Sequence, residues 1–303
     1  MSAFSELLME HAESAPALIF LHVHKTAGQT FNHILYRLYP ADACCHVDAD
    51  AWRNWPAFVE QFRQETEFRR RAFAVVEGHM YFGLHALLPQ RGRYVTFLRE
   101  PRARTVSLFE FIRRNPRVGP VHRQVVDSRL DLAGYLARGL HLPADNGQTR
   151  FISGITDRRY GECDVTMLEA AKRNLDDSFL LAGLLENFDE SLLLLQDLLG
   201  WREPWYRPVN VAPTIGPRDP LSPATLAQVD RYNVFDQELY HFARSRLHAL
   251  LERRGEAFQA RVRRFRRQMV VYRLTQRVSR HMRGLVRTVA NTGLKPPGAV
   301  TGR

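Results

Sequence analysis

The sequence predicts an α/β protein, with a mostly parallel sheet flanked by helices and a C-terminal helical extension. Short apolar runs alternate with helical patterns, polar residues follow each run, and the basic charge is concentrated in the tail. The apolar runs at 17–23, 73–76, 94–98 and 179–183 are the expected strands. Because strands that alternate with helices form parallel pairs, we expect helices on both faces of the sheet.

Helical patterns fill the intervals between these runs. Phe31 begins an apolar period after the first run, and Pro101 opens the segment RARTVSLFEFIRR, which has one apolar face. Further helices are expected at 130–137, at 166–175, after a cap at Asn187, and at 222–251. The stretch 201–223 holds six prolines and is expected to be irregular.

The composition excludes several classes of protein. No run of about 18 apolar residues is present, which excludes a membrane span. The first residues carry acids rather than a basic leader, so no signal peptide is predicted, and three cysteines are too few for a disulfide framework. Both features favour a cytoplasmic location. Cys44, Cys45 and His46 lack the two-residue gap of zinc sites, so no metal is expected there.

The net charge of +11 belongs to the tail, because residues 252–303 hold 14 basic and 2 acidic side chains. We therefore predict a catalytic domain at 1–254 and a basic amphipathic tail at 255–303, disordered at its end. The tail is expected to pack on the body, to hold a polyanionic glycan, to pair with another subunit, or to lie peripherally on the inner face of an anionic membrane. No nucleic acid is expected as a partner.

The segment His24-Lys25-Thr26-Ala27-Gly28-Gln29-Thr30 joins the first strand to the first helix. Such a turn directs backbone N–H groups and the helix dipole at one point, which favours an anion. Lys25 adds a charge, Thr26 and Thr30 add hydroxyls, and Gly28 permits close approach. The lysine precedes the glycine, so this phosphate cradle is not a Walker A sequence. The alternative is a surface turn with a chance lysine.

A second polar segment follows the strand at 94–98. Arg99 and Ser107 stand eight residues apart, and a guanidinium with a hydroxyl suits a terminal phosphate. In the alternative interpretation Arg99 forms a salt bridge with Glu100 or another neighbour.

Four segments together resemble carbohydrate sulfotransferases, in particular the heparan sulfate 2-O- and 6-O-sulfotransferase group and its bacterial relatives. LHVHKTAGQTF is similar to their 5′-phosphosulfate loop, and LREP followed by Ser107 is similar to their LRDP segment. DNGQTRF and FLLAGLLENFDESLLLL also match in order, so the resemblance spans residues 18–201, about 60% of the chain.

This resemblance implies a P-loop-NTPase-like fold and an enzyme that moves a sulfuryl group from 3′-phosphoadenosine 5′-phosphosulfate (PAPS) to a hydroxyl of a carbohydrate or glycolipid. Lys25, Thr26, Ala27, Gly28, Gln29 and Thr30 are expected to bind the 5′ end of PAPS. Arg99 and Ser107 are expected to bind its 3′-phosphate, and Arg150 lies in a loop expected to touch the nucleotide. No metal is implied.

The catalytic base is expected to be a histidine, because its ordinary pKa lies near neutral pH. His79 follows the strand at 73–76, and the resembling families have their histidine in this place. Glu77 is expected to orient it or to repel the acceptor, and Lys25 to neutralise charge on the leaving phosphate. His85 is the rival base.

Two other functions stay open from the sequence. A P-loop-type nucleotide kinase would use the same strand–loop–helix unit, and a non-catalytic basic binding protein would use the tail. The acceptor cannot be identified from the sequence, because acceptor specificity depends on segments outside the matched motifs. Here these segments are 46–71, 114–129 and 201–223. Trp52 in the first of these could stack on a sugar or belong to the core.

Overall fold

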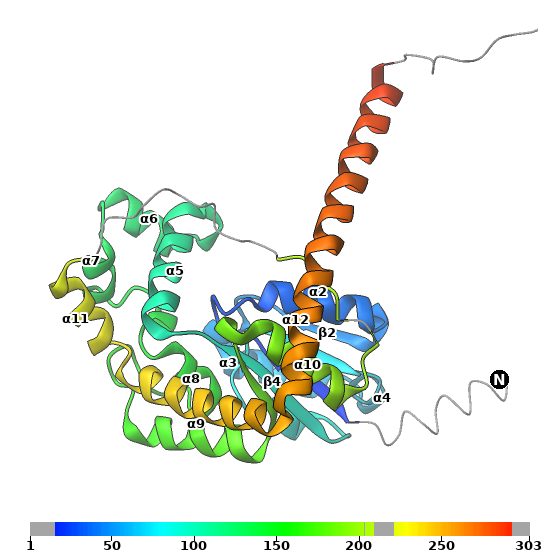
Figure 1. The fold of residues 1–303 in the computed structure, drawn as a ribbon. Helices are drawn as coiled ribbons and strands as arrows, with labels where there is room; N and C mark the ends of the chain where they lie inside the picture. Colours follow the sequence, from blue (N-terminus) through cyan, green and yellow to red (C-terminus); the bar gives the residue numbers. More distant parts are fainter. Residues whose placement is uncertain (1–15, 203, 209–220, 293–303) are drawn as a thin grey trace, which may run out of the picture. The chain divides into compact units, whose positions relative to one another are not determined.

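The computed structural model describes residues 16–202, 204–208 and 221–292 (Figure 1). At its centre lies a five-stranded parallel sheet with the strand order β2-β3-β1-β4-β5. The strands are β1 (Ala17–Leu21), β2 (Cys44–Val47), β3 (Val75–Gly78), β4 (Gly92–Leu98) and β5 (Phe179–Leu184). The predicted α/β fold with a parallel sheet is confirmed, and the four predicted strands are each correct to within two residues at either end.

Helices flank this sheet in chain order. The longer ones are α2 (Gly28–Leu38), α3 (Trp55–Gln64), α4 (Glu67–Arg71), α5 (Pro101–Arg114), α6 (Pro120–Asp127), α7 (Leu132–Ala137), α8 (Gly147–Ser153), α9 (Val165–Asp177), α10 (Phe188–Leu199), α11 (Pro223–Arg231) and α12 (Val234–Thr292). The helix predicted at 222–251 is thus two helices, separated at 232–233. Asn187 occupies the N-cap position of α10 but makes no capping bond with its side chain.

The edge strand β2 is not among the strands that the sequence predicts. It pairs with β3 alone and holds the residues Cys44, Cys45 and His46. Because side chains alternate along a strand, Cys44 and His46 point to one face and Cys45 points to the other. These three residues therefore do not converge on a metal ion. Among the residues that the structure describes, no group of three or more metal-ligand side chains lies close enough to hold one.

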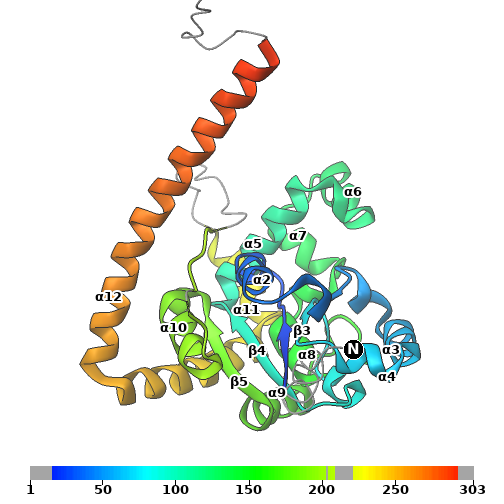
Figure 2. The same cartoon turned by 90° about the vertical axis from the view of Figure 1, so that its right-hand side faces the viewer.

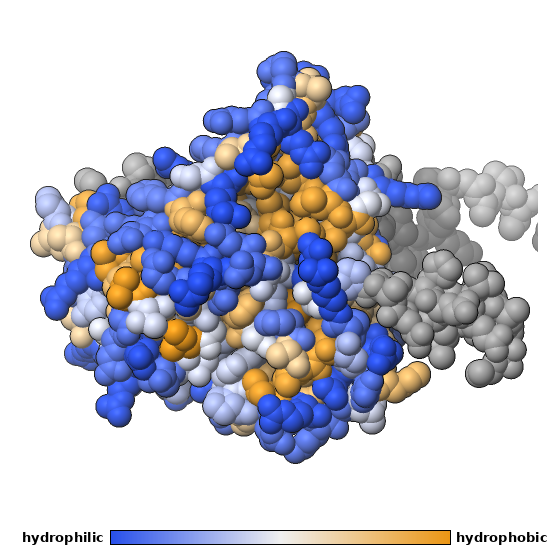
Figure 3. Space-filling view, turned by 90° about the horizontal axis from the view of Figure 1, so that it is seen from below, coloured by the Kyte–Doolittle hydropathy of each residue, from blue (hydrophilic) through white to orange (hydrophobic). Residues whose placement is uncertain are grey.

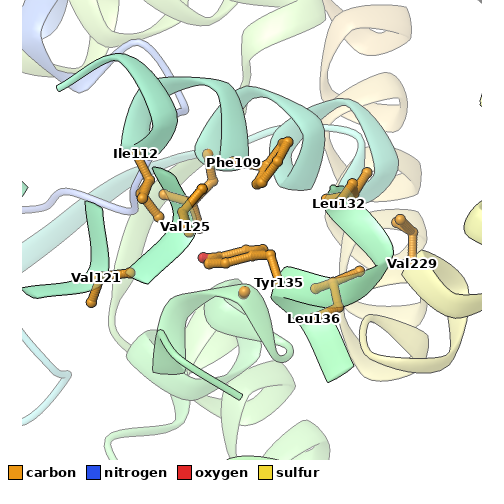
Figure 4. Packing of buried hydrophobic residues seen from close by; sticks show 10 residues of the cluster. Phe109, Ile112, Val121, Val125, Leu132, Tyr135, Leu136 and Val229 are labelled. Carbon is orange, nitrogen blue, oxygen red and sulfur yellow. The ribbon is translucent and has the colours of Figure 1, made fainter. Parts of the chain in front are cut away.

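An apolar cluster joins the helices that follow β4. It packs the inner faces of α5, α6, α7 and α11 around Tyr135 (Figure 4). Its buried members are Leu108, Phe109, Ile112, Val121, Val125, Leu132, Tyr135, Leu136, Ala144 and Val229. The cluster holds α5 in place beside the sheet, and α5 carries several of the candidate site residues.

The first part of α12 runs beside α8 and α9 (Figures 1 and 2). Arg246 on α12 forms a salt bridge of 2.6 Å with Asp176 on α9, and Asp236 accepts hydrogen bonds from the first turn of α8. Seen from below, hydrophilic residues cover much of the surface and apolar ones gather in separate areas between them (Figure 3). No helix in the described ranges is long and apolar enough to cross a membrane.

Backbone contacts divide the chain into two compact units, Met1–Gly255 and Glu256–Arg303. Gly255 interrupts the helical geometry of α12 with φ 66°. The predicted C-terminal helical extension is confirmed, since α12 continues to Thr292. The domain boundary at 254 and the role of the basic tail stay predictions, and the expected disordered end lies outside the described residues, as does most of the proline-rich stretch.

Candidate functional site

The loop between β1 and α2 has an unusual backbone. Lys25 and Ala27 both have a left-handed conformation, with φ 69° and 67°, and Thr26 between them does not. A residue with a side chain pays about 1 kcal/mol or more for this conformation. Alternation of this kind turns successive N–H groups toward one concave point, next to the N-terminus of α2. The loop geometry therefore suits an anion.

Three cations gather at this loop. A side-chain N–H of Arg99 donates to the backbone oxygen of Lys25 at 3.3 Å, and the Lys25 Nζ lies 4.3 Å from the centre of the Phe111 ring. Burial, followed by the charges of Arg99 and Arg114, lowers the pKa of Lys25 to about 8. Positive charges that repel one another at close range are suited to bind a ligand with more than one negative charge.

The chain at the end of β4 is held by α8 and by the first turn of α5. The side-chain amide of Gln148 accepts from the backbone N–H of Arg99 at 2.9 Å and donates to its backbone oxygen at 3.0 Å. The carboxylate of Glu100 accepts from the N–H groups of Arg102 and Ala103, and so caps α5. These contacts fix the backbone from which the Arg99 guanidinium extends.

Ser107 lies on the side of α5 that meets the loop. At 100° per residue, Ser107, Phe111 and Arg114 fall within about 60° of one another around the helix. Phe111 touches Lys25, so Ser107 is one helical turn away from that contact. The structure therefore brings together the loop, Arg99 and the Ser107 face of α5, as the sequence predicts.

Two loop residues have structural roles that the sequence analysis did not foresee. The Thr26 hydroxyl donates to the backbone oxygen of Val23 at 2.9 Å, so its single hydrogen is not available to an anion while that bond lasts. At Gly28, a Cβ atom would lie 1.9 Å from the imidazole ring of His22. Of the other predicted residues, Gln29 is exposed at the helix start and Thr30 is buried.

Replacing Gly28 with alanine is accordingly expected to destabilise the protein by about 2 kcal/mol or more, because either the ring of His22 or the start of α2 has to move. Chemical denaturation measures this loss. Alanine at Gly200, where nothing lies within 4 Å of the added Cβ atom, is a control for the added methyl group, although its φ of 68° adds strain of its own. Equal losses in the two variants would contradict the steric explanation.

Three histidines stack at the edge of the loop. The His79 ring lies between those of His22 and His24, at centroid distances of 4.1 and 3.8 Å. His79 Nδ1 lies 2.6 Å from the backbone oxygen of His22, and a carbonyl can only accept, so Nδ1 carries the hydrogen. In neutral His79 the lone pair is then on Nε2, which is the tautomer that a base requires.

Burial keeps this stack uncharged. It is the largest cause that lowers the pKa of His79 to about 4, and it also holds the pKa of His22 and of His24 well below the ordinary value. A charge on His79 would repel a charge on His22 or His24, which lowers the pKa of those two rings further. At neutral pH, His79 is therefore uncharged.

The rival histidine lies elsewhere. His85 Nδ1 is 3.1 Å from the Tyr94 hydroxyl, and its Cβ lies beside Gly92, the first residue of β4. This is the amino edge of the sheet, opposite the edge where β1 leads into Lys25. The geometry thus places His79, and not His85, beside the loop.

Glu77 does not take the role expected of it. Its buried carboxylate accepts from Asn32 at 2.5 Å and from the Tyr36 hydroxyl, and contacts His46 Nδ1 at 2.5 Å. These partners lie on α2 and β2. Glu77 therefore joins the edge of the sheet to α2, and His79 is oriented by a backbone oxygen instead.

The prediction for Arg150 requires correction. The segment around it is the helix α8 rather than a loop, and Arg150 is 3% exposed. Its guanidinium pairs with Asp145 and donates to the backbone oxygens of Arg158 and Arg159. Sequence could not show this, because an arginine that supports a turn and one that binds a phosphate look the same. The member of this motif that reaches the site is Gln148.

Phe111, Arg114 and Gln148 were not assigned roles from the sequence. Phe111 and Arg114 follow Ser107 at helical spacings of four and seven, so a helical projection of α5 could have found them. Gln148 had no such signal, since it reaches Arg99 across 49 positions of the chain.

Comparisons with known proteins bear on this site. A family profile described as galactose-3-O-sulfotransferase matches residues 3–279. The chain is 32% identical over 247 residues to human galactose-3-O-sulfotransferase 3, covering 74% of this chain and 54% of that protein. It is 27% identical over 261 residues to pig galactose-3-O-sulfotransferase 2, covering 79% and 63%. It is also 27% identical over 266 residues to human galactosylceramide sulfotransferase, covering 80% and 58%.

The chain therefore spans between half and two thirds of the length of these relatives. The matched proteins are carbohydrate sulfotransferases, as the resemblance implied, but they are not the heparan sulfate 2-O and 6-O group or its bacterial relatives. Two of the segments that carried the resemblance, LHVHKTAGQTF and LREP, were those predicted to bind the nucleotide, and a shared nucleotide does not distinguish acceptors.

The predicted cytoplasmic location, including the inner face of the membrane, is wrong. The relatives are Golgi-type sulfotransferases, which are lumenal. The prediction depended on an acidic N-terminus and on few cysteines, and neither feature specifies a compartment.

Proposed function

The chain belongs to the galactose-3-O-sulfotransferase family, and from this premise we propose that it transfers a sulfuryl group from PAPS to hydroxyl 3 of a galactose unit in a carbohydrate or glycolipid. The observation that carries the proposal is the contact between Arg99 and the backbone of Lys25 at 3.3 Å. It brings two cationic segments, from different strands, to one place where a doubly phosphorylated nucleotide can bind both. The strand order, with the loop following the central strand β1, supports a P-loop-like fold.

The residues present fit the donor. The Lys25–Thr30 loop has the concave backbone and the cation that a 5′-phosphosulfate requires, and Arg99 with Ser107 offers a guanidinium and a hydroxyl to a 3′-phosphate. When bound, the donor supplies the electrophilic sulfur and the leaving group 3′,5′-ADP. Lys25 neutralises the charge that develops on the leaving phosphate.

His79 takes the proton. As the acceptor oxygen forms its bond to sulfur and the bond from sulfur to the phosphate oxygen breaks, the hydroxyl proton passes to Nε2 of His79. The backbone oxygen of His22 holds the opposite ring nitrogen and stabilises the imidazolium that results. The stack with His24 keeps the ring plane fixed.

Transfer of sulfur-35 from labelled PAPS to octyl β-galactoside tests the proposal. Labelled galactoside should form with the wild-type chain, and its formation with His79→Ala should be slower by a factor of about 10² or more. If the wild type transfers no label to β-galactosides, the proposal that galactose is the acceptor is contradicted. Equal transfer by the variant would exclude His79 as the base.

The kinase alternative differs in its nucleotide. A thermal-shift comparison should show stabilisation by 3′,5′-ADP of about 2 kcal/mol or more at saturating concentrations, with little effect from ATP and Mg²⁺. The reverse order would favour a phosphotransferase, and no effect of either nucleotide would favour a non-catalytic binding protein.

The affinity for 3′,5′-ADP is expected to fall as the pH rises through about 8, because Lys25 loses its charge there. Calorimetry at pH 7 and pH 9 measures this change. Lys25→Arg provides the matched control, because arginine stays charged over this range. The affinity of this variant for 3′,5′-ADP should therefore change little between pH 7 and pH 9. A wild-type affinity that is the same at both pH values would show that Lys25 does not bind the nucleotide.

A further inference from the structure

Two buried histidine nitrogens beside the proposed site take no part in the transfer described above. His141 is 5% exposed, and its Nδ1 atom and that of His24 are buried without a hydrogen-bond partner among the described residues. A buried polar atom that lacks a partner destabilises the folded chain. Such atoms therefore require an explanation, and a ligand that bonds to them is one.

These histidines lie close together and close to His79. Their ring centres are 6.1 Å apart with the planes at 90°, and His24 also stacks on His79 at 3.8 Å. Both rings meet the indole of Trp52 at 84°, at 5.7 Å for His24 and 5.5 Å for His141. The buried ring of Phe151 lies 5.3 Å from His24. The pair thus adjoins the proposed base and is surrounded by aromatic rings.

The two histidines are suited to a neutral ligand. Burial lowers the pKa of His141 to about 3 and that of His24 well below its ordinary value, so both are neutral at pH 7. A neutral imidazole has one donor and one acceptor, and a hydroxyl likewise donates and accepts. Phosphate and sulfate only accept, and are better matched by Lys25 and Arg99. Trp52 and Phe151 are 7% and 1% exposed, so the two nitrogens lie in an apolar environment, where a hydrogen bond to a ligand is stronger than in water.

We infer that His141, together with His24, binds the acceptor sugar through a ring hydroxyl next to the one that is sulfated. This inference rests on the proposed function, and it makes His141 a specificity-determining residue and not a second base. With hydroxyl 3 of galactose beside His79, the flanking hydroxyls are those at positions 2 and 4. A contact to one of them holds hydroxyl 3 against His79 and selects sugars that carry the partner hydroxyl.

Deoxy acceptors test this inference directly. We would measure kcat/KM for octyl β-galactoside and for its 2-deoxy and 4-deoxy analogues, with PAPS as donor, in the wild-type chain and in His141→Phe. The wild type should disfavour one of the analogues about 10-fold or more, because the buried nitrogen is then left without its partner. In His141→Phe the parent acceptor should lose a similar factor, and the discrimination against that analogue should disappear.

Two further measurements separate binding of the sugar from a general structural role. The affinity for 3′,5′-ADP and the midpoint of thermal unfolding should stay near their wild-type values in His141→Phe. His33→Phe on the exposed side of α2 is the matched control, and it should keep the wild-type discrimination.

If the ratio of kcat/KM between the parent acceptor and each deoxy analogue is the same in His141→Phe as in the wild type, the inference is overturned. The proposed function would stay intact. A variant that unfolds, or that loses nucleotide affinity, is replaced by His141→Asn under the same criterion. Failure of the wild type to sulfate any β-galactoside would overturn the proposed acceptor and this inference together.

Discussion

Replacing His79 with asparagine is expected to lower kcat for sulfuryl transfer about 10²- to 10⁴-fold, the usual contribution of a general base. Asparagine can still donate to the backbone oxygen of His22, because its amide nitrogen is bonded to Cγ as is the Nδ1 atom of His79, which lies 2.6 Å from that oxygen. Asparagine cannot take a proton at neutral pH. The affinity for 3′,5′-ADP should stay near the wild-type value. Single-turnover kinetics with PAPS and a β-galactoside measure the first quantity, and calorimetry measures the second.

The pH profile adds a sharper criterion for His79. Its pKa is lowered to about 4, so the base is already deprotonated well below pH 6 and kcat/KM should not fall with the ordinary histidine pKa of about 6.5. The same shift makes the protein less stable in acid. Because the unfolded state binds the proton more readily than the folded state between pH 6.5 and pH 4, stability is lost as the pH falls through that window. An acid limb of kcat/KM centred near 6.5, in a protein that stays folded, would contradict this environment for His79.

Replacing Lys25 with methionine is expected to lower kcat/KM about 10³-fold, through weaker donor binding and through loss of the charge that stabilises the leaving phosphate. The same change should make the ligand-free protein more stable. In the folded chain the ammonium is partly desolvated and lies near the charges of Arg99 and Arg114, which is why its pKa is lowered to about 8. The apolar methionine removes that repulsion and keeps the contact with the Phe111 ring.

Lys172→Met on α9 is the matched control for this substitution. Lys172 pairs with Glu169 at 2.9 Å, so its replacement removes an attraction instead of a repulsion, and neither activity nor nucleotide affinity should change. Kinetics and thermal unfolding of the two variants side by side measure both effects. A Lys25→Met protein that is less stable than wild type, with nucleotide affinity retained, would show that Lys25 is a structural residue.

The strands, and the polar segments that follow them, could be predicted because their signals are local. The run before His24 is apolar and ends in a polar turn. Parallel strands present such turns at one edge of the sheet, and Lys25, Arg99 and His79 all follow strands. β2 was missed because it is an edge strand of four residues, without a long apolar run.

What the sequence could not show depends on long-range partners. Gly28 was interpreted as room for a ligand, and the structure shows that the ring of His22 takes that room. Arg150 was interpreted as a nucleotide contact, whereas Asp145 and two backbone oxygens engage it. The orphaned nitrogen of His141 becomes visible only when the whole chain packs around it.

The central claim is that Lys25 and Arg99 hold opposite ends of one nucleotide. Calorimetric titration of the wild type and of Arg99→Gln with 3′,5′-ADP and with 5′-AMP tests it most directly. The account predicts that the variant binds 3′,5′-ADP no more tightly than the wild type binds 5′-AMP, and that its affinity for 5′-AMP is unchanged. An Arg99→Gln protein that still prefers 3′,5′-ADP over 5′-AMP as strongly as the wild type does would contradict the claim.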